Sequence, residues 1–279
     1  MRASGLALLP WTMSSSLGAD LSVLWHMRRL LAVLTRRELS ARFAGSAGGV
    51  LWVWLPPVLT MAAYFLVFDL VFGMRLSSGA PTARVGTFLI VGMLAWMAFA
   101  DAAQRGMSSL IDAGGLLQKN PLPAVLFPAR AVLASTVVFA PLILLLILLY
   151  APAHRFHLAV IAVPALILLQ TLLSFLVSYL LAILAAALRD VVQVVGVLLS
   201  LGIFLSPVLF PMSMFPSNWR WLLWFNPMTA PILGYQAALL QGAWPAPAVW
   251  AAIAAWIAGM ALVLSVAVAR SREHLVDWL

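Results

Sequence analysis

The chain has 279 residues, of which 65% are hydrophobic and 9% charged, and its mean hydropathy is +1.07. Soluble domains are closer to half apolar and a quarter charged, so the composition excludes that class and indicates an all-α polytopic membrane protein. The net charge of +8 does not indicate nucleic acid binding, because basic residues in a membrane protein mark the side on which a loop lies. The chain contains no cysteine, which excludes disulfides and thiolate chemistry.

The N-terminal segment, residues 1–45, is predicted to lie on the cytoplasmic side. Its start weakly resembles a signal peptide, but the apolar run is short and is interrupted by Pro10. An arginine cluster follows between Arg28 and Arg42, and such a cluster disfavours export of this end. We therefore expect the segment to remain uncleaved.

A basic amphipathic helix is predicted within this segment, from Leu21 to Phe43. At a period of about 3.6 residues, one face carries Met27, Leu30, Leu31 and Leu34, and the other carries Arg29, Arg36 and Ser40. Such a helix lies in the membrane interface, where its arginines meet anionic lipid headgroups. A charge cluster that only sets the topology is the alternative.

Six apolar segments are long enough to cross the hydrocarbon core, which takes roughly twenty residues in a helix. They are expected at about 50–72, 86–108, 125–150, 158–187, 191–210 and 247–269. With the N-terminus inside, three quarters of the basic residues are cytoplasmic, and only Arg75, Arg84, Arg155 and Arg220 are outside. This bias predicts cytoplasmic termini, a transmembrane domain over 46–270 and a tail over 271–279.

Two opposite charges, Asp101 and Arg105, lie four residues apart near the inner end of the second predicted span. This spacing puts them on one helix face, where they can form an ion pair. A charge at mid-bilayer costs at least about 2.5–3.5 kcal/mol, so both side chains are expected to face protein or water. The pair either lines an inner vestibule or fixes helix packing.

Lys119 is the only lysine, and the sequence has no G-x-x-x-x-G-K-[ST] phosphate loop. If ATP drives transport, another polypeptide must hydrolyse it, and this chain is expected to bind no cofactor. The segment 112–123, DAGGLLQKNPLP, joins the second and third spans on the cytoplasmic face. It is interpreted either as a tight connection or as a coupling helix that docks on an ATPase through Leu116, Leu117, Gln118, Lys119 and Asn120.

The stretch 206–235 is too apolar for an ordinary loop and has too many prolines for a spanning helix. Each proline removes a backbone donor, and irregular backbone at membrane depth is stable only where protein or a water-filled cavity pairs its polar groups. We therefore predict a re-entrant or gate-forming element over about 207–235, with a surface loop as the alternative. The candidate gate residues are Pro207, Pro211, Trp219, Trp221, Asn226 and Pro227.

Aromatic side chains are abundant in the first two predicted spans. Flat rings can stack on sugar faces, so these residues are candidates for lining a carbohydrate conduit; lipid anchoring or helix packing is the alternative for each one. The conduit candidates are Tyr64, Phe65, Phe68, Trp96 and Phe99.

Enzymatic chemistry is not indicated. The histidines, at positions 26, 154, 157 and 274, fall at interfaces, in loops or in the tail. Without cysteine, and with few carboxylates at membrane depth, the sequence offers neither a metal site nor a catalytic triad.

Four motifs in order give the chain a family resemblance over about residues 28–270. They are RRELSARFAGSAGGVLWVWLPPVLTMAAYFLVFDLVF at 36–72, GLLQKNPLPAVLFPAR at 115–130, Arg189-Asp190 before the fifth span, and LSPVLFPMSMFPSNWRWLLWFNPMTAPILGY at 205–235. With these motifs the chain resembles the membrane subunit of an ABC-2 type exporter, in the branch that exports polysaccharide or polyol phosphate. It departs from the family in the prolines at 121 and 123, which shorten the coupling helix.

The resemblance implies an ABC-2 (type V) exporter fold in the cell inner membrane. Two copies of this subunit would form the path, and two copies of a separate cytoplasmic ATPase would bind ATP and Mg²⁺. The implied cargo is a glycan linked to undecaprenyl pyrophosphate, of O-antigen, capsule or teichoic type. Residues 207–235 would form outer gate helices, and Arg36, Arg37 and Arg42 would meet the pyrophosphate on the cytoplasmic side.

Two other functions remain as alternatives. An ABC-2 exporter of a small molecule or lipid is the nearer one, and a closed apolar pocket would favour it. A membrane-embedded glycan-modifying enzyme is the more distant one, because it would need a titratable cluster at one depth.

Overall fold

A computed structural model of the chain describes residues 17–42, 45, 48–49, 51–76, 80–120, 122–155 and 157–271. The first sixteen residues of the predicted N-terminal segment, and all of the predicted tail except Ser271, lie outside this described part. The α-helices are α1 Leu17–His26, α2 Arg28–Ala41, α3 Leu51–Tyr64, α4 Val85–Asp112, α5 Gly114–Leu117, α6 Leu126–Leu149, α7 Ala151–His154, α8 Ala162–Ala187, α9 Val191–Gly202, α10 Arg220–Leu223, α11 Thr229–Gln236 and α12 Pro247–Ser271.

Shorter elements connect or extend these helices. π-Helical turns over Phe65–Val71 and Ala237–Gln241 continue α3 and α11. 3-10 turns cover Leu158–Ile161, Met212–Met214 and Ser217–Trp219. The only strand-like pairing within the described residues is an isolated antiparallel bridge between Arg75 and Arg84.

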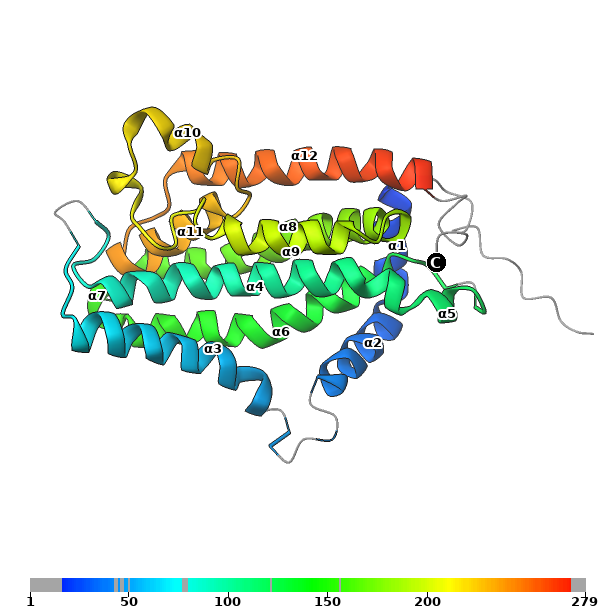
Figure 1. The fold of residues 1–279 in the computed structure, drawn as a ribbon, viewed down its shortest axis with the longest axis horizontal. Coiled ribbons are helices and arrows are strands. Elements are labelled where there is room, and N and C mark those ends of the chain that lie inside the picture. The colour runs from blue at the N-terminus through cyan, green and yellow to red at the C-terminus, as the bar shows by residue number, and fades with distance from the viewer. Residues whose placement is uncertain are drawn as a thin grey trace, which may run out of the picture.

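Five helical segments are long and apolar enough to cross a membrane. They are Leu51–Val71, Val85–Asp112, Leu126–Leu149, Leu158–Ala187 and Pro247–Ser271, and they match five of the six predicted spans. The long helices run roughly parallel, and α1, α2, α5 and the end of α12 gather at one end (Figure 1). We refer to this end as the predicted cytoplasmic end, and to the end that carries α7 as the predicted outer end.

The fifth predicted span, 191–210, is wrong in its length. Helix α9 ends at Gly202 and has 12 residues, which at a rise of about 1.5 Å per residue is about 18 Å. The chain then turns, because Pro207 has no backbone N–H and disfavours helix in the residue before it. Helix α9 alone is therefore shorter than the hydrocarbon core.

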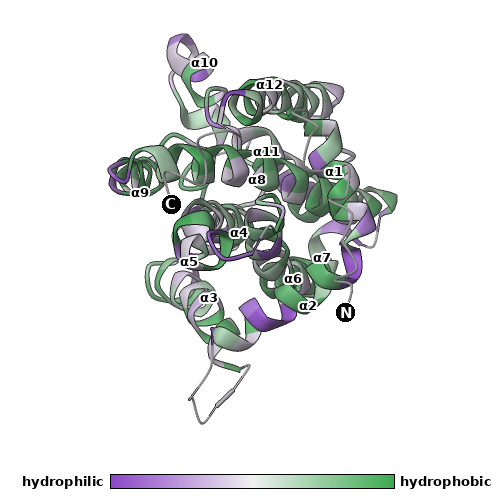
Figure 2. Cartoon of the chain, turned by 90° about the vertical axis from the view of Figure 1, so that its right-hand side faces the viewer, coloured by the Kyte–Doolittle hydropathy of each residue, from purple (hydrophilic) through white to green (hydrophobic). Residues whose placement is uncertain are grey.

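Helix α4 is the central helix of the bundle. In its most apolar stretch 67% of the residues are buried. The corresponding share is 6% in Leu51–Val71, which is α3 with its π-helical extension and is called the α3 segment below. Helix α4 packs closely on α8, where a Cβ on Gly106 would lie 2.4 Å from Cβ of Ser178. The Ser178 hydroxyl also donates to the carbonyl of Ala102 at 3.0 Å. Viewed along the bundle, α6 and α9 flank α4 on opposite sides (Figure 2).

The N-terminal helix is divided into two by a turn at Met27. All four residues of the predicted apolar face pack in one cluster with buried residues of α6, α8 and α12. The face therefore covers protein rather than lying only in lipid. A hydrogen bond of 2.9 Å from the Tyr179 hydroxyl to Asp20 fixes α1 to α8.

The start of α4 is capped by a residue of the preceding segment. Asp69 accepts hydrogen bonds from the backbone N–H groups of Gly86 at 2.7 Å and Thr87 at 3.0 Å, and from the Thr87 hydroxyl at 2.9 Å. A carboxylate here pairs free N–H groups and complements the positive end of the helix dipole. The cap also fixes where the loop before α4, with Arg84, meets the bundle.

Candidate functional site

A charged cluster joins α2 to the centre of the bundle near the predicted cytoplasmic end. The Arg42 guanidinium lies 3.1 Å from Asp101 of α4, and it also donates to the Ser135 hydroxyl of α6 at 3.1 Å. Ser135 in turn donates to Asp101. The predicted ion pair of Asp101 with Arg105 is present, at 2.8 Å. Asp101 thus contacts both arginines, one from another helix and one from its own.

The two ion pairs of Asp101 differ in how much they contribute to stability, because their arginines are buried to different extents. The Arg42 side chain is 6% exposed, whereas Arg105 is 44% exposed. Burial lowers the pKa of the Arg42 guanidinium, and the Asp101 carboxylate opposes this shift. A buried cation without its partner is costly, while an exposed pair is worth about 1 kcal/mol or less. Asp101 is therefore needed chiefly by Arg42.

A second ion pair fixes α2 one turn earlier. Glu38 lies 3.6 Å from Arg130 of α6, whose guanidinium also stacks over the ring of Phe127. Beside these pairs is a polar pocket of about 330 Å³. Its lining residues are Glu38, Asp101, Gln104, Arg105, Ser108 and Asp112. Sequence reasoning missed this pocket, because it is assembled from α2 and α4 rather than from one motif.

The three arginines predicted to meet pyrophosphate do not form one site. Arg36 and Arg37 are exposed on α2, and Arg36 lines a separate pocket of about 370 Å³ with Trp54. Arg42 is directed into the bundle and is bound by Asp101. Only Arg36 and Arg37 therefore remain available to a ligand at the surface.

The predicted coupling segment forms a single helical turn, α5, between α4 and α6. Leu117 is buried and anchors the turn, and Leu116 is 43% exposed. Gln118, Lys119 and Asn120 are exposed beyond it. Helix α5 lies at the predicted cytoplasmic end (Figure 1). The turn and the residues after it therefore expose one apolar and three polar side chains at this end.

The proline-rich segment after α9 returns into the bundle. Short turns and α10 lead to α11, which is almost fully buried and packs with α4, α8 and α12. The predicted gate residues divide into two groups. Pro207, Pro211 and Asn226 are buried and Pro227 is partly buried, whereas Trp219 and Trp221 are more than half exposed at the tip.

Two side-chain amides pair backbone groups of the irregular segment around these prolines. The Asn226 amide donates to the carbonyls of Gly202 at 2.8 Å and Leu205 at 3.2 Å, and its oxygen accepts from the N–H of Met228 at 2.9 Å. The Gln236 amide donates to the carbonyl of Pro207 at 2.7 Å. Both amides join the end of α9 to the returning segment, as irregular backbone at membrane depth requires.

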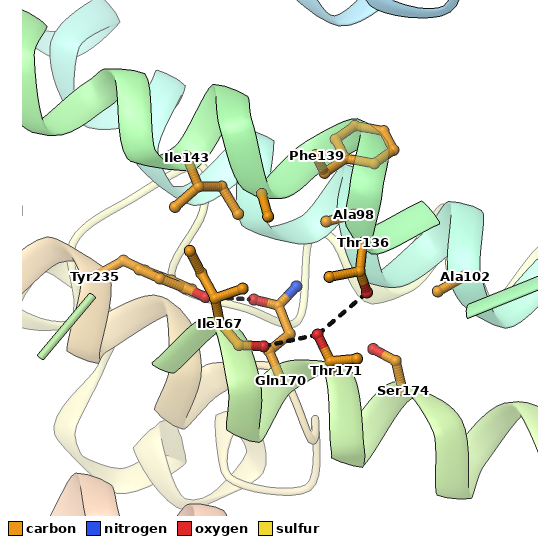
Figure 3. A pocket seen from close by; sticks show the side chains of 11 residues that line it. Ala98, Ala102, Thr136, Phe139, Ile143, Ile167, Gln170, Thr171, Ser174 and Tyr235 are labelled. Carbon is orange, nitrogen blue, oxygen red and sulfur yellow. Dashed lines mark hydrogen bonds between the residues drawn. The ribbon is translucent and has the colours of Figure 1, made fainter. Parts of the chain in front are cut away.

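A buried polar seam lies where α11 meets α8 (Figure 3). The Tyr235 hydroxyl donates to Gln170 at 2.9 Å, and the Gln170 amide donates to the carbonyl of Ala95 in α4 at 2.9 Å. The hydroxyls of Thr136 and Thr171 form a hydrogen bond of 3.1 Å, and both residues line a cavity of about 20 Å³. Sequence reasoning missed this seam; a glutamine in a long apolar run was the available signal.

The aromatic conduit candidates occupy two different environments. Trp96 and Phe99 are 6% and 4% exposed, and a Cβ on Gly202 would lie 2.7 Å from the Trp96 ring. These two rings therefore pack in the core and face no open surface of the subunit. Tyr64, Phe65 and Phe68 lie on the exposed α3 segment, where the rings of Tyr64 and Phe68 stack at 5.8 Å.

Comparison with known proteins gives consistent results over most of the chain. The model of the ABC-2 type transporter family matches residues 29–240. An O-antigen export system permease protein of Myxococcus xanthus is 33% identical over 77% of this chain and 81% of its own length. An O-antigen export system permease protein of Klebsiella pneumoniae is 26% identical over 78% of this chain and 83% of its own length. A polysialic acid transport protein of Escherichia coli is 25% identical over 85% of this chain and 91% of its own length.

The family match spans α2 to α11, so it includes the charged cluster, the α5 turn and the returning segment. The chain belongs to the family of ABC-2 type transporter membrane proteins.

Proposed function

We propose that this chain is the permease subunit of an ATP-driven exporter that moves a polysaccharide across the cytoplasmic membrane. The observation that carries the proposal is the likeness to O-antigen and polysialic acid export proteins, each over more than three quarters of the chain. The five apolar helices provide the membrane domain. The exposed faces of α3 and α9 offer surfaces on which a second copy would complete the path.

The energy would come from a partner protein, because this sequence has no phosphate loop. Two copies of a cytoplasmic ABC ATPase would bind ATP and Mg²⁺ and would push on α5. Motion of α5 would reach the bundle through α4, and the Arg42–Asp101 contact would carry α2 with it. The segment 207–235 would then open on the outer side.

The first test disrupts the outward face of α5. Leu116→Asp combined with Lys119→Glu places two negative charges where one apolar and one basic side chain are exposed. Loss of two interface contacts of hot-spot size, about 2 kcal/mol each, would lower the ATPase recovered with the tagged protein at least about tenfold. The measurement is a pull-down from membranes in mild detergent, with ATPase activity assayed on the eluate.

The control is Arg270→Glu, which makes the same charge reversal as Lys119→Glu on an exposed residue at the same end of the bundle. It should leave the recovered ATPase unchanged. If no nucleotide-binding protein is recovered even with the unmodified chain, the exporter proposal fails.

The cargo is proposed to be a glycan on undecaprenyl pyrophosphate, which approaches through Arg36 and Arg37. At about 1 kcal/mol per arginine near an anionic lipid group, Arg36→Gln with Arg37→Gln should weaken binding of a lipid-pyrophosphate-linked glycan about 30-fold. Binding to the purified protein measures this effect. Arg28→Gln with Arg29→Gln, at the other end of α2, is the control. Equal losses in both double variants would show only general attraction, and unchanged binding would rule out the site.

A further inference from the structure

A cavity of about 760 Å³ lies between α3 and α6, near the predicted outer end. Its walls are apolar: Val58, Met61 and Phe65 come from the α3 segment, and Leu145 and Leu149 from α6. On the inner side, the Trp54 indole donates to the carbonyl of Val138 at 2.9 Å and joins the two helices. We call this space the α3–α6 groove. Of the transport residues described above, the conduit candidate Phe65 lines it, whereas the charged cluster, α5 and the segment 207–235 do not.

One charged residue, Arg84, lies among the residues that line the groove. It is exposed and directly precedes the first residue of α4. A basic residue at the boundary of an apolar span lies at the level of the lipid headgroups. Among the described residues, no carboxylate forms an ion pair with Arg84, and nearby Asp69 is occupied by the cap of α4.

We propose that the α3–α6 groove is a binding site for one anionic glycerophospholipid of the outer leaflet, such as phosphatidylglycerol. Its acyl chains would cover the apolar walls, and its phosphate would contact Arg84. The groove matches this occupant in both respects, because its lining is mostly apolar and its only charged residue, Arg84, lies at the headgroup level. The bound lipid would fill the space between α3 and α6 and so hold the exposed α3 segment on the bundle.

The headgroup contact is tested with arginines of the same loop. Arg75 pairs with Arg84 in the isolated bridge, is also exposed, and does not line the groove. Native mass spectrometry of the purified protein would count retained phosphatidylglycerol, with phosphatidylcholine of the same chains as comparison. Arg84→Ala should weaken retention of phosphatidylglycerol about fivefold, and Arg75→Ala and Arg84→Lys should preserve it.

The acyl contact is tested with neighbouring alanines of α3. Ala62 lines the groove and Ala63 does not, and both are exposed. Ala62→Trp should place an indole ring in the groove where the acyl chains would lie, and so remove the retained lipid. It should also remove the increase in thermal midpoint that added phosphatidylglycerol gives. Ala63→Trp should keep both. Because Arg84→Ala changes no packed residue, it remains informative if Ala62→Trp does not fold.

Three results would overturn the proposal. The first is equal retention of phosphatidylglycerol in the unmodified protein and in the Arg84→Ala and Ala62→Trp variants. The second is equal retention of phosphatidylcholine and phosphatidylglycerol, which would remove the selectivity for anionic lipid. The third is retention of undecaprenyl phosphate in preference to phosphatidylglycerol, which would assign the groove to the carrier lipid.

Discussion

Replacing Asp101 with asparagine is expected to destabilise the protein by about 3 kcal/mol, because Arg42 would remain buried without its counter-charge. Asparagine keeps the size of the side chain and can still accept a hydrogen bond from Ser135, so the change removes mainly the charge. The thermal unfolding midpoint of the purified protein and its amount in membranes both measure the effect. Export should fall with the amount of folded protein, because α2 loses its fixed position.

Two further variants separate this effect from a general one. Arg105→Gln should cost less than about 1 kcal/mol, because Arg105 is 44% exposed and its pair is partly solvated. Asp101→Asn combined with Arg42→Gln should be more stable than Asp101→Asn alone, because no buried charge is left unpaired. An Asp101→Asn protein as stable as the unmodified one would show that the cluster does not hold α2 in place.

The same cluster shows what sequence reasoning can find. Asp101 and Arg105 are four residues apart on one helix, so local geometry was enough to predict their contact. Arg42 lies 59 positions from Asp101, and nothing in the local pattern directs its side chain inward. The family resemblance, with their shared charge and interfacial position, grouped Arg36, Arg37 and Arg42 as one candidate site. Tertiary packing separates them.

The helix predictions likewise succeed where the local sequence determines the structure and fail where tertiary packing does. Five of the six predicted spans form long apolar helices, because a long apolar run has few alternatives to a membrane helix. The length of α9 was wrong, because the apolar run continues through Pro207 while the helix does not. The prolines predicted a re-entrant or gate-forming element over about 207–235, but not the helix α11 or its partners. Tyr235 and Gln236 bond with residues 65 and 29 positions away, and their pairing depends on the assembled fold.

Replacing Asn226 with leucine is expected to cost about 2 kcal/mol or more, because the buried N–H of Met228 and the carbonyl of Leu205 lose their partner. The carbonyl of Gly202 keeps a hydrogen bond from the N–H of Leu205. The amide pairs two carbonyls at the end of α9 and one N–H before α11, and an unpaired buried group costs about 1–3 kcal/mol. Gln236→Leu should cost less, because it removes one bond, to Pro207.

The order of these effects tests whether the amides hold the returning segment in place. Asn218→Leu is the matched control, since Asn218 is exposed at the tip of the same segment, and it should change stability by less than about 0.5 kcal/mol. Thermal unfolding should show the largest loss of stability for Asn226→Leu, a smaller loss for Gln236→Leu and the smallest for Asn218→Leu. If the segment gates the path, the first two variants should also admit small polar solutes into vesicles that contain the protein, because α9 would no longer be tied to the segment. Equal stability of the Asn226 and Asn218 variants would instead mean that water pairs these carbonyls, and that the amides are not what closes the outer end.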